Sequence, residues 1–128
     1  MRVKLPRIEE WNAGRRLAAE RYRACLSGLE GVTLPEEKSY AKHVYHQYTL
    51  RIADGKRDEL QARLEAEGIS SIVYYPLPVH RLPVYAPSLW DLPTAEALAG
   101  EVLSIPIWPQ IEAETQLWIS EKIKQSLR

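Results

Sequence analysis

The segment of residues 44–75 limits the possible folds most strongly. Residues 44–52, VYHQYTLRI, place alternate side chains on opposite sides, and this period of two predicts a β-strand. Residues 57–68, RDELQARLEAEG, carry acidic residues early and leucines one turn apart, which predicts a helix that stops at Gly68. Residues 69–75, ISSIVYY, are rich in β-branched and aromatic residues and predict a second strand. The segment therefore predicts a strand–helix–strand unit.

Helical patterns flank this unit on both sides. The sequence predicts a long opening helix of about residues 6–29, with Pro6 in its first turn. The apolar stripe of this helix is Ile8, Trp11, Ala18, Tyr22, Cys25 and Leu29. Residues 94–102 predict a helix that is capped by Thr94 and has Val102 on its inward face, and residues 113–128 predict a closing helix. We therefore expect one α+β domain over residues 1–128, a small sheet covered on one face by helices.

Charge and composition exclude several classes of protein. Seventeen basic and seventeen acidic residues give a formal net charge of zero, so we expect no nucleic-acid partner. The single cysteine, Cys25, forms no internal disulfide, and no apolar run approaches the length that spans a membrane. The first ten residues contain no apolar signal core. We therefore expect a cytoplasmic protein without a membrane partner.

The familiar catalytic and metal-binding patterns are missing from the sequence. His43 and His46 are three residues apart, and on a strand such positions face opposite sides, so we expect no metal site. Cys25 lies on the inward stripe of the opening helix and is interpreted as a buried structural thiol. No glycine-rich phosphate loop and no nucleophile elbow is present.

The proline-rich segment of residues 74–85, YYPLPVHRLPVY, is the candidate site. Its three prolines fix φ angles and so lower the entropy cost of holding one shape. Phenol, imidazole and guanidinium groups donate hydrogen bonds to hydroxylated or phosphorylated ligands. If the preceding strand reaches Tyr74 and Tyr75, one ring packs inward and the other faces a cleft. The residues alone leave an alternative open, a connector whose tyrosines only cap the core.

Several blocks of the sequence resemble the DegT/DnrJ/StrS family of sugar aminotransferases, which use pyridoxal phosphate. The blocks are residues 7–35, HVYHQYTLRI, RDELQARLEAEGI, YYPLPVH and LPTAEALAGEVLSIPIWP, in the family's order and at similar spacing. The resemblance covers nearly the whole chain but only the C-terminal part of such an enzyme. It implies the fold of the C-terminal domain of fold-type I aminotransferases, a small, mainly antiparallel sheet covered on one face by helices. It also implies amino transfer to a keto-sugar nucleotide, in polysaccharide or antibiotic sugar biosynthesis.

The resemblance assigns substrate binding, but no catalytic residue, to this chain. The lysine that forms the Schiff base belongs to the N-terminal large domain of the family, and none of the chain's lysines has the family's serine-x-x-x-lysine-like setting. These lysines are Lys4, Lys38, Lys42, Lys56, Lys122 and Lys124. We therefore expect no cofactor, metal or catalytic residue in the chain alone. The implied partners are the missing large domain, a nucleotide sugar and a possible second copy.

Three residues are carried over to the mouth of the active site. Tyr75 and His80 match a tyrosine and a histidine of the family's turn, and Tyr74 stands where many relatives have histidine. Ile72 stands where many have glycine. Together, Tyr74, Tyr75 and His80 are expected to orient the sugar or its phosphates. Because Tyr74 and Ile72 depart from the family pattern, they leave open which sugar fits.

Two other hypotheses remain. The chain could be a stand-alone small-ligand-binding or regulatory α+β module, or a protein-interaction domain anchored by Trp11, Trp90, Trp108 and Trp118. The simpler interpretation of the tryptophans is core packing. A domain that has lost its partner should expose apolar side chains along the opening helix and near the proline-rich segment.

Overall fold

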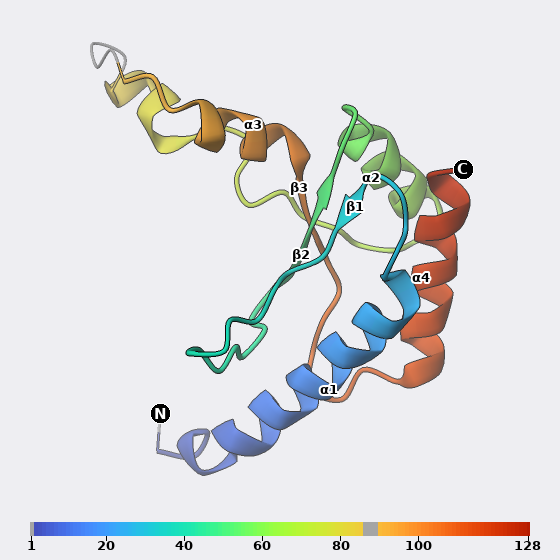
Figure 1. The fold of residues 1–128 in the computed structure, drawn as a ribbon. Helices are drawn as coiled ribbons and strands as arrows, with labels where there is room; N and C mark the ends of the chain where they lie inside the picture. The colour runs from blue at the N-terminus through green and yellow to red at the C-terminus, as the bar shows by residue number, and fades with distance from the viewer. Residues whose placement is uncertain (1, 86–89) are drawn as a thin grey trace.

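A computed structural model describes residues 2–85 and 90–128 (Figure 1). The domain interpreted as residues 1–128 therefore includes Met1 and residues 86–89, which lie outside the described part. The helices and strands are η1 (Leu5–Arg7), α1 (Ile8–Leu26), β1 (Val32–Thr33), β2 (Tyr48–Ile52), α2 (Arg57–Ala66), η2 (Val79–Arg81), η3 (Pro83–Tyr85), α3 (Pro93–Glu101), β3 (Val102–Ile105) and α4 (Ala113–Ser126), where η marks a short 3₁₀ helix.

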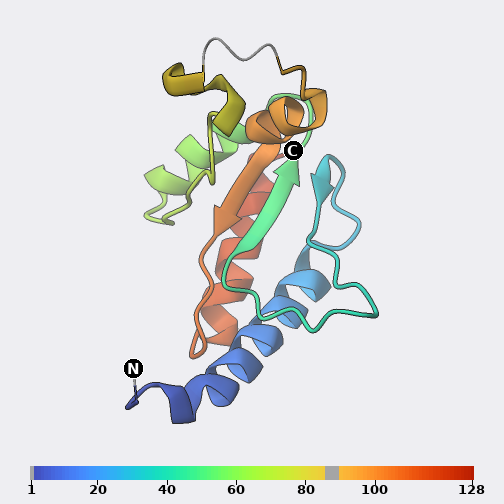
Figure 2. The ribbon, with the colours of Figure 1, turned by 90° about the vertical axis from the view of Figure 1, so that its left-hand side faces the viewer.

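The sheet has the strand order β1-β2-β3, and both neighbouring pairs are antiparallel. In the central pairing Tyr48 faces Ile105 and Leu50 faces Leu103. On the outer edge of β3, Ser104 forms an isolated antiparallel bridge with Ile72. Helices α1, α2 and α4 lie together on one side of these strands (Figures 1 and 2). The predicted α+β class, with a small antiparallel sheet covered by helices, is confirmed.

The core lies between the sheet and these helices. Strand β2 alternates as predicted, because Tyr48, Leu50 and Ile52 are buried while Arg51 is exposed. The largest fully buried apolar side chains are Tyr22, Tyr48, Leu26, Leu50, Ile52, Leu60, Leu64, Leu103 and Ile123. They come from α1, β2, α2, β3 and α4, so a single core ties all five elements together.

The two long helices are fixed to each other by polar contacts and by one close approach. Gln116 of α4 is buried and donates from Nε2 to the carbonyl oxygen of Ala18 on α1 at 2.8 Å. Near the start of α1, a Cβ built on Gly14 would overlap the carbonyl oxygen of Pro109, in the loop before α4. Glycine is therefore required where the helix crosses this loop.

One predicted element is wrong in type, and another is correct except for its last residue. Residues 69–75 form no continuous strand, and among them only Ile72 pairs with another residue. The helix expected over residues 94–102 ends at Glu101, and Val102 begins strand β3 with an extended backbone, φ −74° and ψ 137°. Pairing with β2 satisfies the backbone groups of residues 102–105, and this tertiary gain outweighs the local helical pattern.

Two further elements have different ends from those predicted. The opening helix is shorter than residues 6–29, because it ends at Leu26 and Gly28 follows with φ +75°. Strand β2 begins at Tyr48 rather than at residue 44. Tyr45 has φ +46°, and this left-handed backbone breaks the alternation, so that Tyr45 is buried and His46 is exposed.

The interpretation of the tryptophans as core residues is wrong. Trp90, Trp108 and Trp118 are exposed, and Trp11 is only half-buried. Cys25 packs against the core, as expected of a structural thiol, but it is half-buried rather than buried. None of the described helices is both long and apolar enough to cross a membrane.

Candidate functional site

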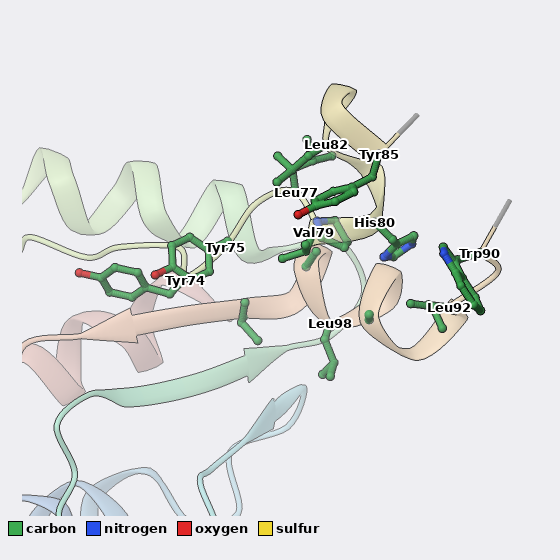
Figure 3. A pocket seen from close by; sticks show the side chains of 14 residues that line it. Tyr74, Tyr75, Leu77, Val79, His80, Leu82, Tyr85, Trp90, Leu92 and Leu98 are labelled. Atoms are coloured by element: carbon green, nitrogen blue, oxygen red, sulfur yellow. The ribbon is translucent and has the colours of Figure 1, made fainter. Parts of the chain in front are cut away.

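A groove of about 940 Å³ is lined by the proline-rich segment, by α3 and by the first residue of β3, Val102. We call it the proline-loop groove. In Figure 1 its elements extend away from α1, α2 and α4. Its lining is Tyr74, Tyr75, Leu77, Pro78, Val79, His80, Leu82, Tyr85, Trp90, Leu92, Ala95, Leu98, Ala99 and Val102. The groove thus contains all three residues expected at the substrate site, within a mainly apolar and aromatic wall (Figure 3).

The proline-rich segment is held by short-range backbone hydrogen bonds. Pro78 has the extended conformation, φ −62° and ψ 147°, that leads into the 3₁₀ helix η2. Within the turns that follow, the amide of Arg81 donates to Pro78 at 2.9 Å and that of Leu82 to Val79 at 3.1 Å. The amide of Tyr85 donates to Leu82 at 2.8 Å. The segment is therefore a series of tight turns with a defined shape, as the prolines predict.

Tyr74 and Tyr75 both face the groove, and neither packs inward. Their exposed fractions are 38% and 72%, and their rings meet edge-to-face with centroids 5.6 Å apart. The expected division into one inward and one outward ring is wrong, because strand pairing ends at Ile72 and no longer imposes alternation. The alternative in which the tyrosines cap the core is also contradicted. Figure 3 places both phenol hydroxyls at one end of the groove, away from Trp90 and Leu92.

His80 lies in the groove wall and is bound to α3. Its side chain is 8% exposed, and its Nε2 lies 2.9 Å from Oε1 of Glu96. Arg81 donates to the same carboxylate oxygen from Nε at 3.0 Å and from Nη2 at 2.6 Å. The hydrogen bond from His80, followed by those from Arg81, holds the pKa of Glu96 below its usual value.

This contact changes what His80 can offer to a ligand. An ionised Glu96 only accepts hydrogen bonds, so Nε2 of His80 carries the proton and donates to it. In the neutral ring, Nδ1 is then an acceptor. The donor role expected for His80 is thus already used inside the protein, and the hydroxyls of Tyr74 and Tyr75 are the better placed donors.

Several residues of the site carry no functional signal in the local sequence. Glu96 binds His80 without lining the groove, and an acidic residue in the first turn of a helix is a common feature with no functional meaning of its own. Tyr85, Leu92 and Leu98 line the groove without being predicted there, and Trp90 is predicted only as a protein anchor. A local pattern gives no sign of these residues, since the contact between His80 and Glu96 spans sixteen positions.

The two other histidines lie elsewhere. Nδ1 of His43 accepts a hydrogen bond from the Tyr45 amide at 2.8 Å, and the two rings lie 4.1 Å apart. His46 is exposed. Over residues 2–85 and 90–128, no group of three or more His, Cys, Asp or Glu residues could hold a metal ion.

Exposed apolar side chains occur in both places where a lost partner was expected to leave them. On and before α1 they are Val3, Leu5, Ile8 and Leu17. Around the groove they are Ile72, Tyr74, Tyr75, Leu77, Val79, Val84, Tyr85, Trp90 and Leu92. Such a concentration of exposed apolar side chains on a small domain is typical of surfaces that contact another protein segment or a ligand.

Comparison with known proteins gives a consistent result. The profile of the DegT/DnrJ/EryC1/StrS aminotransferase family matches residues 1–124. The "pleiotropic regulatory protein" of Geobacillus stearothermophilus is 43% identical over 131 residues, which are 98% of this chain and 35% of that protein. A dTDP-3-amino-3,4,6-trideoxy-alpha-D-glucose transaminase of Streptomyces venezuelae is 37% identical over 98% of this chain and 33% of that protein.

The fold agrees with these relatives. The crystal structure of DesV from Streptomyces venezuelae superposes with a TM-score of 0.92 and 36% identity, over 99% of this chain and 34% of that one. The chain therefore spans about a third of the length of the relatives that it matches.

Proposed function

Because the chain belongs to the DegT/DnrJ/EryC1/StrS aminotransferase family, we propose that it is the C-terminal domain of a pyridoxal phosphate-dependent nucleotide-sugar aminotransferase. The proline-loop groove forms one wall of the pocket for the keto-sugar nucleotide. The observation that carries this proposal is that Tyr74, Tyr75 and His80 line one groove in a chain that matches sugar aminotransferases over almost its whole length.

The chemistry of the groove suits a nucleotide sugar in two ways. The hydroxyls of Tyr74 and Tyr75 donate or accept hydrogen bonds with sugar hydroxyls or phosphate oxygens. The flat rings and aliphatic side chains offer apolar surface to the faces of a sugar or a base, and aromatic rings stack on bases without strong sequence preference. These residues position the substrate, and proton transfer belongs to groups outside this chain.

The described residues do not make a complete cofactor site. Pyridoxal phosphate supplies the electron sink for amino transfer and requires a lysine that can bond to it covalently. No lysine lines the groove. Lys38 and Lys122 are paired with Glu36 and Glu67. The lysine would come from the N-terminal large domain of the longer enzyme, so this chain alone transfers no amino group.

The exposed apolar residues support a partner for this domain. The large domain of the same polypeptide would cover part of the surface along α1 and beside the groove, with Leu17 and Tyr75 among the residues it shields from water. A second copy of the enzyme is a further candidate to complete the site.

The test begins with the DNA that precedes the codon for Met1. An in-frame large domain, expressed together with this chain, should transfer the amino group of an amino acid to a dTDP- or UDP-linked keto-sugar. Tyr75→Ala should raise KM for the sugar nucleotide by roughly 10-fold or more, since it removes both a hydrogen-bonding group and an apolar wall. Tyr40→Ala, at an exposed tyrosine that is not part of the groove lining, is the matched control and should leave KM and kcat unchanged. A longer protein without transaminase activity would refute the proposal.

A further inference from the structure

We infer that Glu96 is a positioning residue that fixes the wall of the proline-loop groove and the orientation of His80. This inference rests on the proposed function, because the groove is the site that the carboxylate holds in shape. Glu96 does not itself line the groove, and it acts through His80, which does, and through Arg81.

The first support is the way in which Glu96 connects two segments. Its carboxylate oxygen Oε1 accepts hydrogen bonds from both His80 and Arg81, which belong to η2, while Glu96 itself lies in the first turn of α3. Residues of both elements line the groove, Val79 from η2 and Ala95 from α3. One carboxylate therefore fixes the distance between the two walls.

The second support is that few buried residues stabilise these walls in the described parts of the chain. Neither η2 nor η3 contains a buried residue, and Ala99 is the only buried residue of α3. The segment thus lacks a hydrophobic core of its own, and ionic hydrogen bonds, which are stronger than neutral ones, carry more of the ordering than they would elsewhere in the domain.

The third support concerns the imidazole. Since ionised Glu96 accepts from Nε2, it selects the tautomer in which neutral His80 presents Nδ1 as an acceptor. Loss of the negative charge removes this preference, and the ring can then turn or exchange its proton between the two nitrogens. A misplaced group in the wall of a binding site weakens substrate binding even when the reacting groups are intact.

Glu101 provides a matched control on the same helix. It pairs with Arg51 at 2.8 Å, and its side chain is 31% exposed, against 34% for Glu96. Neither Glu101 nor Arg51 lines the groove. The substitutions Glu96→Gln and Glu101→Gln therefore remove the same charge from the same helix, at similar exposure, and only the first alters a contact with a residue of the groove lining, His80.

The experiment has one structural and one functional measurement. In the 128-residue chain, Glu96→Gln should accelerate hydrogen exchange at the Arg81, Leu82 and Tyr85 amides by roughly 10-fold, and Glu101→Gln should leave it unchanged. In the longer enzyme, Glu96→Gln should raise KM for the sugar nucleotide by roughly 10-fold with kcat changed less than about twofold. The control variant should keep both constants.

Each outcome is decisive for one of the two proposals. Unchanged exchange in Glu96→Gln would overturn the inference, because the walls would then be held without the carboxylate. Faster exchange with an unchanged KM would also overturn it, since Glu96 would have a structural role alone. Absence of turnover in the unsubstituted longer enzyme would refute the proposed function instead, and that result is independent of the exchange measurement.

Discussion

Replacement of Gly14 by alanine tests the packing of α1 against the loop that precedes α4. Two effects of opposite sign compete at this position. Alanine in a helix interior is more favourable than glycine by about 1 kcal/mol, so helix propensity alone predicts a more stable protein. The new Cβ, however, would overlap the carbonyl oxygen of Pro109, and backbone atoms cannot move aside as the end of a flexible side chain can.

The steric effect should win. Overpacking at a close contact costs about 1–3 kcal/mol, because the helix or the loop must shift and disturb its neighbours. One of these neighbours is the buried hydrogen bond between Gln116 and Ala18, one turn further along α1. After subtraction of the propensity gain, we expect Gly14→Ala to lower the free energy of unfolding by up to about 2 kcal/mol.

The matched control is Gly100→Ala in α3, because a Cβ at that position meets no atom within 4 Å. This variant should raise the free energy of unfolding by up to about 1 kcal/mol, with no steric cost. Urea unfolding of the 128-residue chain, followed by circular dichroism, measures both variants against the unsubstituted chain. Equal stabilisation by the two substitutions would refute the close approach of α1 to Pro109.

Four further predictions concern Tyr48, Glu96 and the cofactor. Tyr48→Phe should leave the free energy of unfolding unchanged or raise it by up to about 1 kcal/mol. The reason is that the hydroxyl of Tyr48 is fully buried and has no hydrogen-bond partner among the described residues. A clearly lower free energy of unfolding of this variant in urea would contradict the prediction. The same burial raises the pKa of Tyr48 to about 12, so ultraviolet titration should show this phenol ionising well after an exposed tyrosine such as Tyr40. The hydrogen bonds from His80 and then Arg81 lower the pKa of Glu96. The contribution of the ionised Glu96 side chain to the free energy of unfolding is therefore complete above the usual pKa of 4.5 and is lost as the pH falls through the lower, folded-state pKa. A carbon NMR titration of Glu96 with a midpoint at or above 4.5 would exclude these hydrogen bonds. Finally, the purified chain mixed with pyridoxal phosphate should show no turnover of amino acid and keto-sugar, and turnover by the chain alone would contradict the assignment of the lysine to another domain.

The local pattern of the sequence was sufficient to predict the buried face of those helices and strands whose burial is periodic. The stripe of α1 correctly placed Tyr22 in the core, and the alternation of residues 48–52 gave the buried face of β2. A helix or a half-buried strand repeats its inward positions at a fixed interval, so one element carries its own signal. The prolines of residues 74–85 likewise predicted a rigid segment that forms no α-helix, without reference to any distant residue.

The tertiary structure alone decided which segments pair and which groups meet. Val102 lies in a strand because β2 offers it a partner, and residues 69–75 mostly lack pairing because β3 contacts only Ile72 on that edge. Likewise, the contact of Glu96 with His80, and of Gly14 with Pro109, joins residues distant in sequence. The free energy of such a contact depends on two positions at once, so neither position shows it in its own sequence neighbourhood.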